Sequence, residues 1–250
     1  MTIEFLERDG HPKLAYRKTQ ASEKGAHLPT LMFLGGFKSD MEGTKAEYLE
    51  QQCIARGQAY LRFDYSGHGS SEGKFEEGTI GIWRDDALAV FDTLTEGDVI
   101  LAGSSMGGWI SFLVAAARKD RVKGIVGIAA APDFTKNIES EMSTEQHAEM
   151  QENGYLAVPN DYSDEPYIFT KALIEDGREN SFLEEGLDLT IPVHLVQGMK
   201  DTDVEWQTVH RIKNALSKTE THIVLIEDGD HRLSAKNELQ IIDEQIQELI

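Results

Sequence analysis

Two adjacent serines, Ser104 and Ser105, interrupt the glycine-rich stretch LAGSSMGGW at residues 101–109. The stretch stands where a strand predicted over residues 98–102 passes into a helix predicted over residues 106–118. A glycine-rich turn at such a junction exposes a nucleophilic serine, cradles a phosphate or only closes a loop. The sequence has neither the lysine of a G-x-x-x-x-G-K-[ST] loop nor the dinucleotide fingerprint G-x-G-x-x-G, so a nucleophilic serine is favoured.

The residues around the two serines indicate which of them is the nucleophile. In a G-x-S-x-G turn the serine has a positive φ, and side chains two positions before and after it would collide with neighbouring backbone. In a turn centred on Ser105 these positions are Gly103 and Gly107, whereas a turn centred on Ser104 would place Met106 at one of them. We therefore predict a nucleophile elbow centred on Ser105 and treat Ser104 as a polar residue near the strand end.

A serine hydroxyl needs a base to take its proton and an acid to orient that base. In chains with this elbow the order is serine, acid, histidine, with the acid and the histidine each in a loop after a strand. Of eight histidines, only His231 lies in the loop after the last predicted strand. His68 precedes the serine, while His194 and His222 belong to predicted strands, where packing is the expected role. The predicted base is His231.

The acid is expected in the loop after the strand predicted over residues 191–198. Asp201 lies three residues after Gly198 and three before Val204, which is a usual spacing for this acid. We predict Asp201 as the acid of the catalytic triad, with Asp203 as the alternative.

Attack on an acyl carbon produces an oxyanion that needs fixed donors, usually two backbone N–H groups. One comes from the residue after the nucleophile, which is Met106. We assign the second to Phe37, which follows Gly35 and Gly36 in the loop after a predicted strand. The spacing of the histidines resembles no metal-binding motif, and we expect neither a metal nor a cofactor.

Short β-rich runs alternate with helical patterns from residue 30 onward. The predicted strands cover residues 30–36, 58–64, 98–103, 122–130, 191–198 and 222–229, and the predicted helices cover residues 45–56, 83–94, 106–118, 206–216 and a last segment ending at 250. This alternation predicts an α/β fold with a mostly parallel sheet and helices on both faces. Residues 3–6 and 14–17 could add an antiparallel hairpin at one edge.

The alternation stops between residues 134 and 190. Helical pieces rich in apolar and aromatic residues replace clear strands there, and we predict a small helical lid inserted after the sixth strand, with residues 1–133 and 191–250 as the core. A part of the ordinary helical layer is the alternative. An acyl chain could bind beneath the lid's apolar side chains, which could equally be plain core: Tyr155, Leu156, Tyr162, Tyr167, Phe169 and Phe182.

The composition limits the classes of partner. The 250 residues include 44 acidic and 24 basic ones, and the net charge of -20 repels nucleic acid and anionic membrane surfaces. No apolar run is long enough for a membrane span, and the start of the chain resembles no targeting segment. The single cysteine, Cys53, fits a buried helix position. We expect a cytoplasmic protein from these features.

Five segments carry a resemblance to a known family: GGFKSDMEGTKA at 35–46, RFDYSGHGSSEG at 62–73, GSSMGGW at 103–109, GMKDTDV at 198–204 and DGDHR at 228–232. Together they resemble the α/β-hydrolase domain-containing protein ten family, which comprises mitochondrial acyl-protein thioesterases and bacterial relatives within the α/β-hydrolase superfamily. The resemblance implies a triad of Ser105, Asp201 and His231. It also implies release of fatty acyl groups from cysteine thioesters, as in S-depalmitoylation, and cleavage of acyl glucuronide esters.

These observations predict a serine esterase or thioesterase that forms an acyl-enzyme intermediate. Its partner would be a small-molecule or protein-linked acyl ester or thioester. A serine peptidase of the oligopeptidase type shares the elbow and triad and is one alternative. A non-catalytic ligand-binding module that kept the scaffold is the other. The sequence leaves the oligomeric state open.

Overall fold

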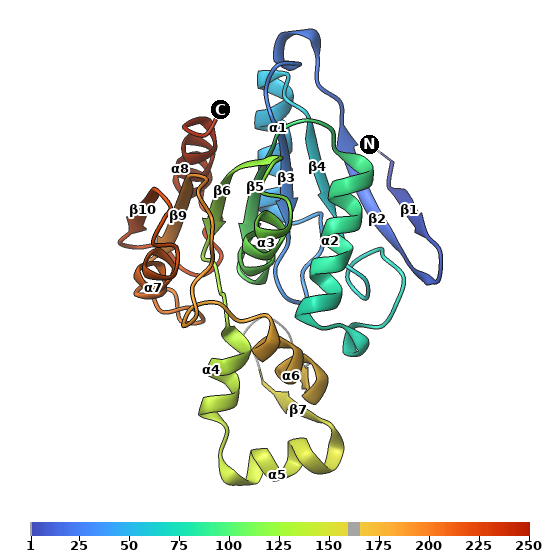
Figure 1. Ribbon diagram of the computed structural model, residues 1–250, viewed down its shortest axis with the longest axis vertical. Helices are drawn as coiled ribbons and strands as arrows, with labels where there is room; N and C mark the ends of the chain where they lie inside the picture. Colours follow the sequence, from blue (N-terminus) through green and yellow to red (C-terminus); the bar gives the residue numbers. More distant parts are fainter. Residues whose placement is uncertain (1, 160–165) are drawn as a thin grey trace.

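The computed structural model describes residues 2–159 and 166–250, which contain an eight-stranded sheet (Figure 1). The strands run in the order β1-β2-β4-β3-β5-β6-β9-β10. Their bounds are β1 Glu4–Arg8, β2 His11–Thr19, β3 Thr30–Leu34, β4 Tyr60–Phe63, β5 Val99–Ser104, β6 Val122–Ile128, β9 Val193–Gly198 and β10 Thr221–Ile226. Neighbours from β4 to β10 pair in parallel, and the β1–β2 hairpin lies antiparallel at one edge. The predicted α/β architecture is confirmed.

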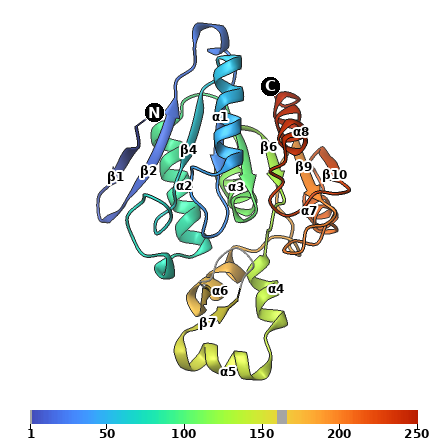
Figure 2. The same cartoon turned by 180° about the vertical axis from the view of Figure 1, so that it is seen from behind.

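Helices cover both faces of the sheet, as the view from behind makes clear (Figure 2). Helices α2 and α3 lie on one face, and α7 packs into the same core cluster, whereas α1 and α8 lie on the other face. The bounds are α1 Thr44–Arg56, α2 Ile80–Leu94, α3 Met106–Ala117, α7 Thr208–Ala215 and α8 Lys236–Gln247. Cys53 is buried in α1, as predicted.

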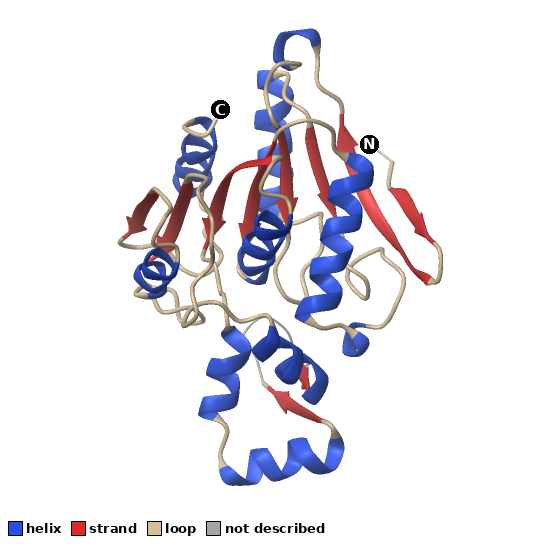
Figure 3. Cartoon of the chain, viewed as in Figure 1, coloured by secondary structure: helices blue, strands red, loops and turns tan. Residues whose placement is uncertain are grey.

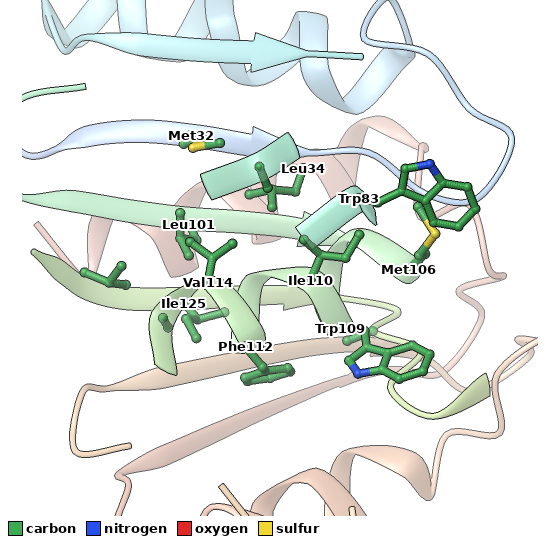
Figure 4. Packing of buried hydrophobic residues seen from close by; sticks show 14 of the residues in the cluster. Met32, Leu34, Trp83, Leu101, Met106, Trp109, Ile110, Phe112, Val114 and Ile125 are labelled. Carbon is green, nitrogen blue, oxygen red and sulfur yellow. The ribbon is translucent and has the colours of Figure 1, made fainter. Parts of the chain in front are cut away.

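Strand β5 is apolar at every position before its glycine because both of its faces are covered. Val99 and Leu101 belong to the core on the α2–α3 side, and Ile100 and Ala102 belong to the core on the α1–α8 side. This alternation follows from the two-residue period of a strand. Figure 4 shows the α2–α3 side, where the side chains of α3 fill the space above the sheet. The strand end that carries Ser105 is therefore held in a packed interior.

The described residues between 134 and 190 form a separate small layer beyond the carboxyl ends of the parallel strands (Figures 1 and 3). It contains α4 Phe134–Glu141, α5 Thr144–Asn153, β7 Tyr155–Val158, β8 Tyr167–Thr170 and α6 Lys171–Glu179. The expectation of helical pieces alone was wrong, because β7 and β8 pair as an antiparallel ribbon. Strands of four residues are too short for a two-residue period to stand out in the sequence. Tyr162 lies outside the described residues.

The buried carboxylate of Asp133 connects the start of this layer to the segment that follows α6. Asp133, directly before α4, has a φ of 58° and accepts hydrogen bonds from the backbone N–H groups of Phe182 and Leu183, each at 3.1 Å. Trp109 of α3 also donates from Nε1 to the carbonyl oxygen of Asn180 at 3.1 Å. These contacts fasten the layer to the core beside the end of β6.

The loop after β3 and the loop after β4 are joined by Asp64. Its Oδ1 accepts the N–H of Met41 at 2.6 Å, and its Oδ2 accepts the N–H of Ser70 at 2.8 Å. Burial raises the pKa of Asp64, although the same two hydrogen bonds act to lower it. The carboxylate thus holds two loops of the carboxyl edge in one arrangement.

His68 makes a second connection between these loops. Its Nε2 accepts the N–H of Lys38 at 3.2 Å, and its Nδ1 lies 3.3 Å from the carbonyl oxygen of Ser66, so Nδ1 carries the proton. The ring packs edge-on against Trp83 with 5.1 Å between centroids. Burial lowers the pKa of His68 from 6.5 to about 4, which keeps the imidazole neutral and able to accept the Lys38 N–H.

The turn between β5 and α3 packs directly against the end of β3. A Cβ placed on Gly107 would lie 2.1 Å from the carbonyl oxygen of Leu34 and 2.5 Å from that of Gly35. Both neighbours are backbone, so neither can swing aside. Glycine at this position lets the elbow contact the loop after β3.

We predict that Gly107→Ala destabilises the fold by about 3 kcal/mol or more, because the added methyl group forces two backbone segments apart. Gly43→Ala is the matched control, since the nearest atom to its added Cβ lies 3.7 Å away and its φ is -66°. Urea unfolding followed by circular dichroism measures both. Equal stability of the two variants would contradict the packing described for the elbow.

We predict that His68 makes stability depend on pH. Because the folded state keeps this imidazole neutral, its contribution is complete above pH 6.5 and is lost as the pH falls towards 4. The loss of unfolding free energy between pH 7 and pH 4.5 should therefore be smaller by about 2–3 kcal/mol in His68→Gln than in the parent. His27→Gln, which changes an exposed histidine, should keep the parent's dependence. A His68→Gln curve parallel to the parent's would refute this assignment.

Candidate active site

Ser105 occupies the turn at the amino end of α3 with φ 55° and ψ -120°. A positive φ is strained for a serine, and the surrounding backbone holds it in place. The N–H of Ser105 donates to the carbonyl oxygen of Ile128 at 2.9 Å, and its carbonyl oxygen accepts from the N–H of Ala131 at 3.1 Å. The turn predicted from the glycine pattern is thus anchored to the end of β6.

His231 lies between Ser105 and Asp201, two residues that are far from each other in the sequence. Its Nε2 is 3.1 Å from Ser105 Oγ, and its Nδ1 is 2.8 Å from Asp201 Oδ2. With the Nδ1 proton directed at the carboxylate, Nε2 is left to accept the serine proton. Asp203, the alternative acid, lies 3.9 Å from His231 Nε2 and its side chain is 42% exposed, whereas that of Asp201 is 0% exposed.

The loops after β9 and β10 pair through backbone hydrogen bonds, and this pairing brings Asp201 to His231. The N–H of Met199 donates to the carbonyl oxygen of Ile226, and the N–H of Lys200 donates to that of Gly229, both at 2.9 Å. Because β9 and β10 are parallel neighbours, their carboxyl ends meet at the same edge of the sheet.

The Asp201 carboxylate is buried and hydrogen-bonded at both oxygens. Oδ1 accepts the N–H groups of Asp203 and Val204 at 2.9 and 2.8 Å. Burial raises the pKa of Asp201, but the hydrogen bond and charge of His231 and these two amides lower it more, so the pKa lies below its ordinary value. Asp201 is therefore an anion that can stabilise a positively charged His231.

Gln197, the penultimate residue of β9, also contacts this carboxylate and was missed by the sequence analysis. Its Nε2 lies 2.8 Å from Asp201 Oδ2, the oxygen that faces His231. Its Oε1 is buried and has no hydrogen-bond partner among the described residues, which costs about 1–3 kcal/mol. The only signal in the sequence is an uncharged amide inside an otherwise apolar strand end.

The two amides predicted as oxyanion donors lie beside Ser105. A Cβ on Gly36 would be 3.3 Å from the Ser105 Cβ, so Gly36 packs against the serine, and Phe37, the next residue, lines the same cavity. Met106 is the first residue of α3, where an N–H group has no acceptor within the helix. In the part of the chain that the structure describes, neither N–H donates to another protein group. Both are available to an anion at the positive end of α3.

A cavity of about 850 Å³ opens at Ser105 and His231. Its apolar wall comes from the loop after β3, the start of α3 and the layer described above, and includes Phe37, Met106, Phe134, Ile138, Val158, Tyr167 and Phe169. Four basic and four acidic residues also line it, so the cavity is balanced in charge although the chain is strongly acidic: Lys38, Lys45, Arg211, Arg232, Asp40, Glu141, Asp203 and Glu205.

Phe37 lies at the centre of the aromatic side chains around this cavity. Its ring stacks on Phe169 with 5.3 Å between centroids and meets Tyr167 edge-on at 5.7 Å. On its other side it contacts Phe75 at 4.8 Å and Trp83 at 5.9 Å. The loop that carries one predicted oxyanion donor is thereby packed against the layer over the cavity.

Two groups of side chains in the described residues could hold a metal ion by geometry, since their donor atoms lie within 4.8 Å of one another. One is Asp201, Asp203 and His231. The other consists of His194 and His222, near the amino ends of β9 and β10, and Glu248, at the end of α8. Each group joins separate loops or strands, so spacing along the chain gave no sign of it. His194 Nδ1 already lies 3.0 Å from Gln245 Oε1.

Comparisons with known proteins identify the family. Residues 29–165 match the family model described as alpha/beta hydrolase fold. The bovine palmitoyl-protein thioesterase ABHD10, mitochondrial, is 36% identical over all 250 residues, which cover 80% of its length. The solved structure of alpha/beta hydrolase domain-containing protein 10 from mouse covers 100% of both chains with a TM-score of 0.90 and 33% identity. A protein of known structure from Agrobacterium vitis S4 matches over 100% of both chains with a TM-score of 0.93 and 38% identity.

The expected cytoplasmic location is contradicted by these relatives. The bovine protein and its mammalian counterparts are named mitochondrial. A targeting segment leaves no trace in the composition or packing of the folded domain, so those features could not support the expectation. Within residues 2–159 and 166–250, no helix combines the length and apolarity of a membrane span.

The match to the ABHD10 proteins extends over the whole chain, and it therefore spans the segments on which the resemblance was based. The family suggested by those segments is thereby confirmed. The chain belongs to the α/β-hydrolase family, in the group of the ABHD10 palmitoyl-protein thioesterases.

Proposed function

We propose that this protein is a serine hydrolase that releases acyl groups from thioesters and esters, with Ser105 as nucleophile, His231 as base and Asp201 as the orienting acid. The observation that carries the proposal is the position of His231, 3.1 Å from Ser105 Oγ and 2.8 Å from Asp201 Oδ2, on the wall of the cavity. Related proteins that are named thioesterases support the type of bond.

In the first half of the reaction, Ser105 Oγ attacks the acyl carbon while His231 Nε2 takes its proton. The negative charge moves to the carbonyl oxygen, which the N–H groups of Phe37 and Met106 stabilise. His231 then gives its proton to the departing thiol or alcohol. The Asp201 carboxylate stabilises the imidazolium while it exists.

In the second half, water enters the position that the leaving group has vacated. His231 takes a proton from this water, and the resulting hydroxide attacks the acyl-enzyme. The carbonyl oxygen again becomes negative beside the same two amides. Collapse of this intermediate releases the carboxylic acid and returns the proton to Ser105.

The cavity favours a fatty acyl chain as the group transferred. Its apolar wall is supplied largely by residues 134–190, which we propose to act as a lid over the core formed by residues 1–133 and 191–250. Each methylene buried against such a wall contributes about 0.8 kcal/mol, so a long chain gains several kcal/mol there. A palmitoyl thioester of a protein cysteine, the substrate named for the relatives, has such a chain.

We predict that Ser105→Ala lowers kcat/KM by about 10⁴-fold or more for a palmitoylated cysteine peptide and a nitrophenyl ester, since the nucleophile is removed. Ser104→Ala is the matched control and should keep most of the activity. A fluorophosphonate probe should form an adduct at Ser105 that mass spectrometry can map.

Three outcomes would contradict this assignment. They are an adduct at another residue, full activity of Ser105→Ala, or loss of activity in Ser104→Ala alone. Turnover of aminoacyl nitroanilides faster than that of nitrophenyl esters would instead favour the peptidase alternative. An inert protein that still binds acyl chains would favour the ligand-binding alternative.

We predict that Val158→Trp shortens the acyl chain that the protein accepts. Val158 lines the cavity from β7, and an indole there fills the volume that the distal methylenes would occupy. Palmitoyl ester turnover should fall about 10-fold or more relative to butyryl ester turnover, because the excluded methylenes lose their burial energy. Ala157→Trp is the control, since the neighbouring residue on β7 is exposed on the opposite face. Chain-length profiles that coincide for the two variants would exclude this wall as the acyl site.

A further inference from the structure

The side chain of Gln197 is fully buried at the end of β9 and meets three acceptors with one amide group. Nε2 lies 2.8 Å from Asp201 Oδ2, 3.2 Å from the carbonyl oxygen of Val204 and 3.3 Å from that of Gly198. The opposite orientation of the amide would place Oε1 against a carboxylate and two carbonyl oxygens. Repulsion from all three fixes Nε2 on the side of Asp201.

This orientation leaves Gln197 Oε1 buried without a partner among the described residues. Buried polar atoms are usually paired, and an apolar side chain of similar volume would fill the same space without this penalty. Packing alone therefore does not account for an amide at this position. What the amide adds is an N–H directed at the acid.

Four donors surround the Asp201 carboxylate. Oδ1 accepts two backbone N–H groups, from Asp203 and Val204, and Oδ2 is shared by Gln197 Nε2 and His231 Nδ1. The backbone donors cannot move independently of the loop. Among the residues that the structure describes, Gln197 is thus the one neutral side-chain donor that shares an oxygen of Asp201 with His231.

We infer that Gln197 is a positioning residue for the reaction, which fixes the plane of the Asp201 carboxylate and limits how tightly His231 holds a proton. The inference rests on the proposed function of Ser105, His231 and Asp201. A neutral donor on Oδ2 disperses part of the carboxylate charge, so the imidazolium is stabilised less. With the donor absent, His231 would remain protonated to a higher pH and the carboxylate could rotate.

Gln197→Leu tests this directly, because leucine fills a similar volume and has no N–H. We expect kcat for a nitrophenyl ester to fall about 10-fold with KM within about 2-fold, the size expected for losing one hydrogen bond to a charged group. The midpoint of the kcat/KM profile against pH should move to higher pH. Gln245→Leu, another buried glutamine near the opposite end of the sheet, should leave kcat and the midpoint unchanged.

We expect the activity of Gln197→Glu to change with pH in the opposite direction from that of the parent. At low pH its protonated carboxyl donates an O–H to Asp201 and replaces the amide, whereas at higher pH two adjacent carboxylates repel each other. Its activity should therefore decline as the pH rises through the range in which the parent gains activity. Circular dichroism checks that each variant is folded. If Gln197→Glu is unfolded, the test of the role of Gln197 rests on Gln197→Leu alone.

The rate of fluorophosphonate labelling at Ser105 separates this inference from the proposed function. Absence of labelling in the parent would overturn the proposed function itself. Alternatively, the parent is labelled at a rate that rises with pH, while Gln197→Leu has the same kcat and the same pH midpoint as the parent. This result would overturn only the role of Gln197. If Gln197→Leu changed the unfolding free energy but left the midpoint of the kcat/KM profile against pH unmoved, Gln197 would have only a structural role.

Discussion

The arrangement of the site depends on one strained turn, in which Ser105 is held at φ 55° between β5 and α3. Such a turn is stable only if the backbone around it can approach closely, and Gly107 allows this by placing α3 against the carbonyl oxygens at the end of β3. The packed interior on both sides of β5 supplies the energy that keeps the turn in place. As a result, Ser105 and Met106 line the same cavity as the loop after β3.

Buried aspartates connect the loops that the strands bring to this edge. Asp64 joins the loops after β3 and β4, and Asp133 joins the two ends of the layer over the cavity. Asp201 does the same within the loop after β9, and it also contacts His231. Each carboxylate accepts two backbone N–H groups, and these hydrogen bonds offset part of the cost of burying the charge. A few carboxylates of this acidic chain are therefore buried and connect loops, whereas most acidic side chains contribute to the surface charge.

Aromatic packing connects the layer of residues 134–159 and 166–190 to the loop beside Ser105. Phe37 supplies a backbone N–H beside Ser105, while its ring stacks on Phe169 from that layer. On the other side, neutral His68 accepts the N–H of Lys38 and holds the same loop against the core. The position of the amide is therefore set from both directions.

The sequence by itself determined the parts that follow from local sterics and from strand order: the turn at Ser105, the alternation of strands and helices, and the loops in which Asp201 and His231 lie. These could be predicted because glycine spacing and hydrophobic periodicity are local properties. Only the tertiary structure shows that Asp201, and not Asp203, contacts His231 Nδ1, since this contact depends on how the loops after β9 and β10 pair. It also revealed Gln197, whose contact with Asp201 is a matter of side-chain orientation, and the β7–β8 ribbon, whose pairing lies outside any periodic pattern. Contacts between segments distant in the chain leave no regular spacing, and so they were decided by the fold.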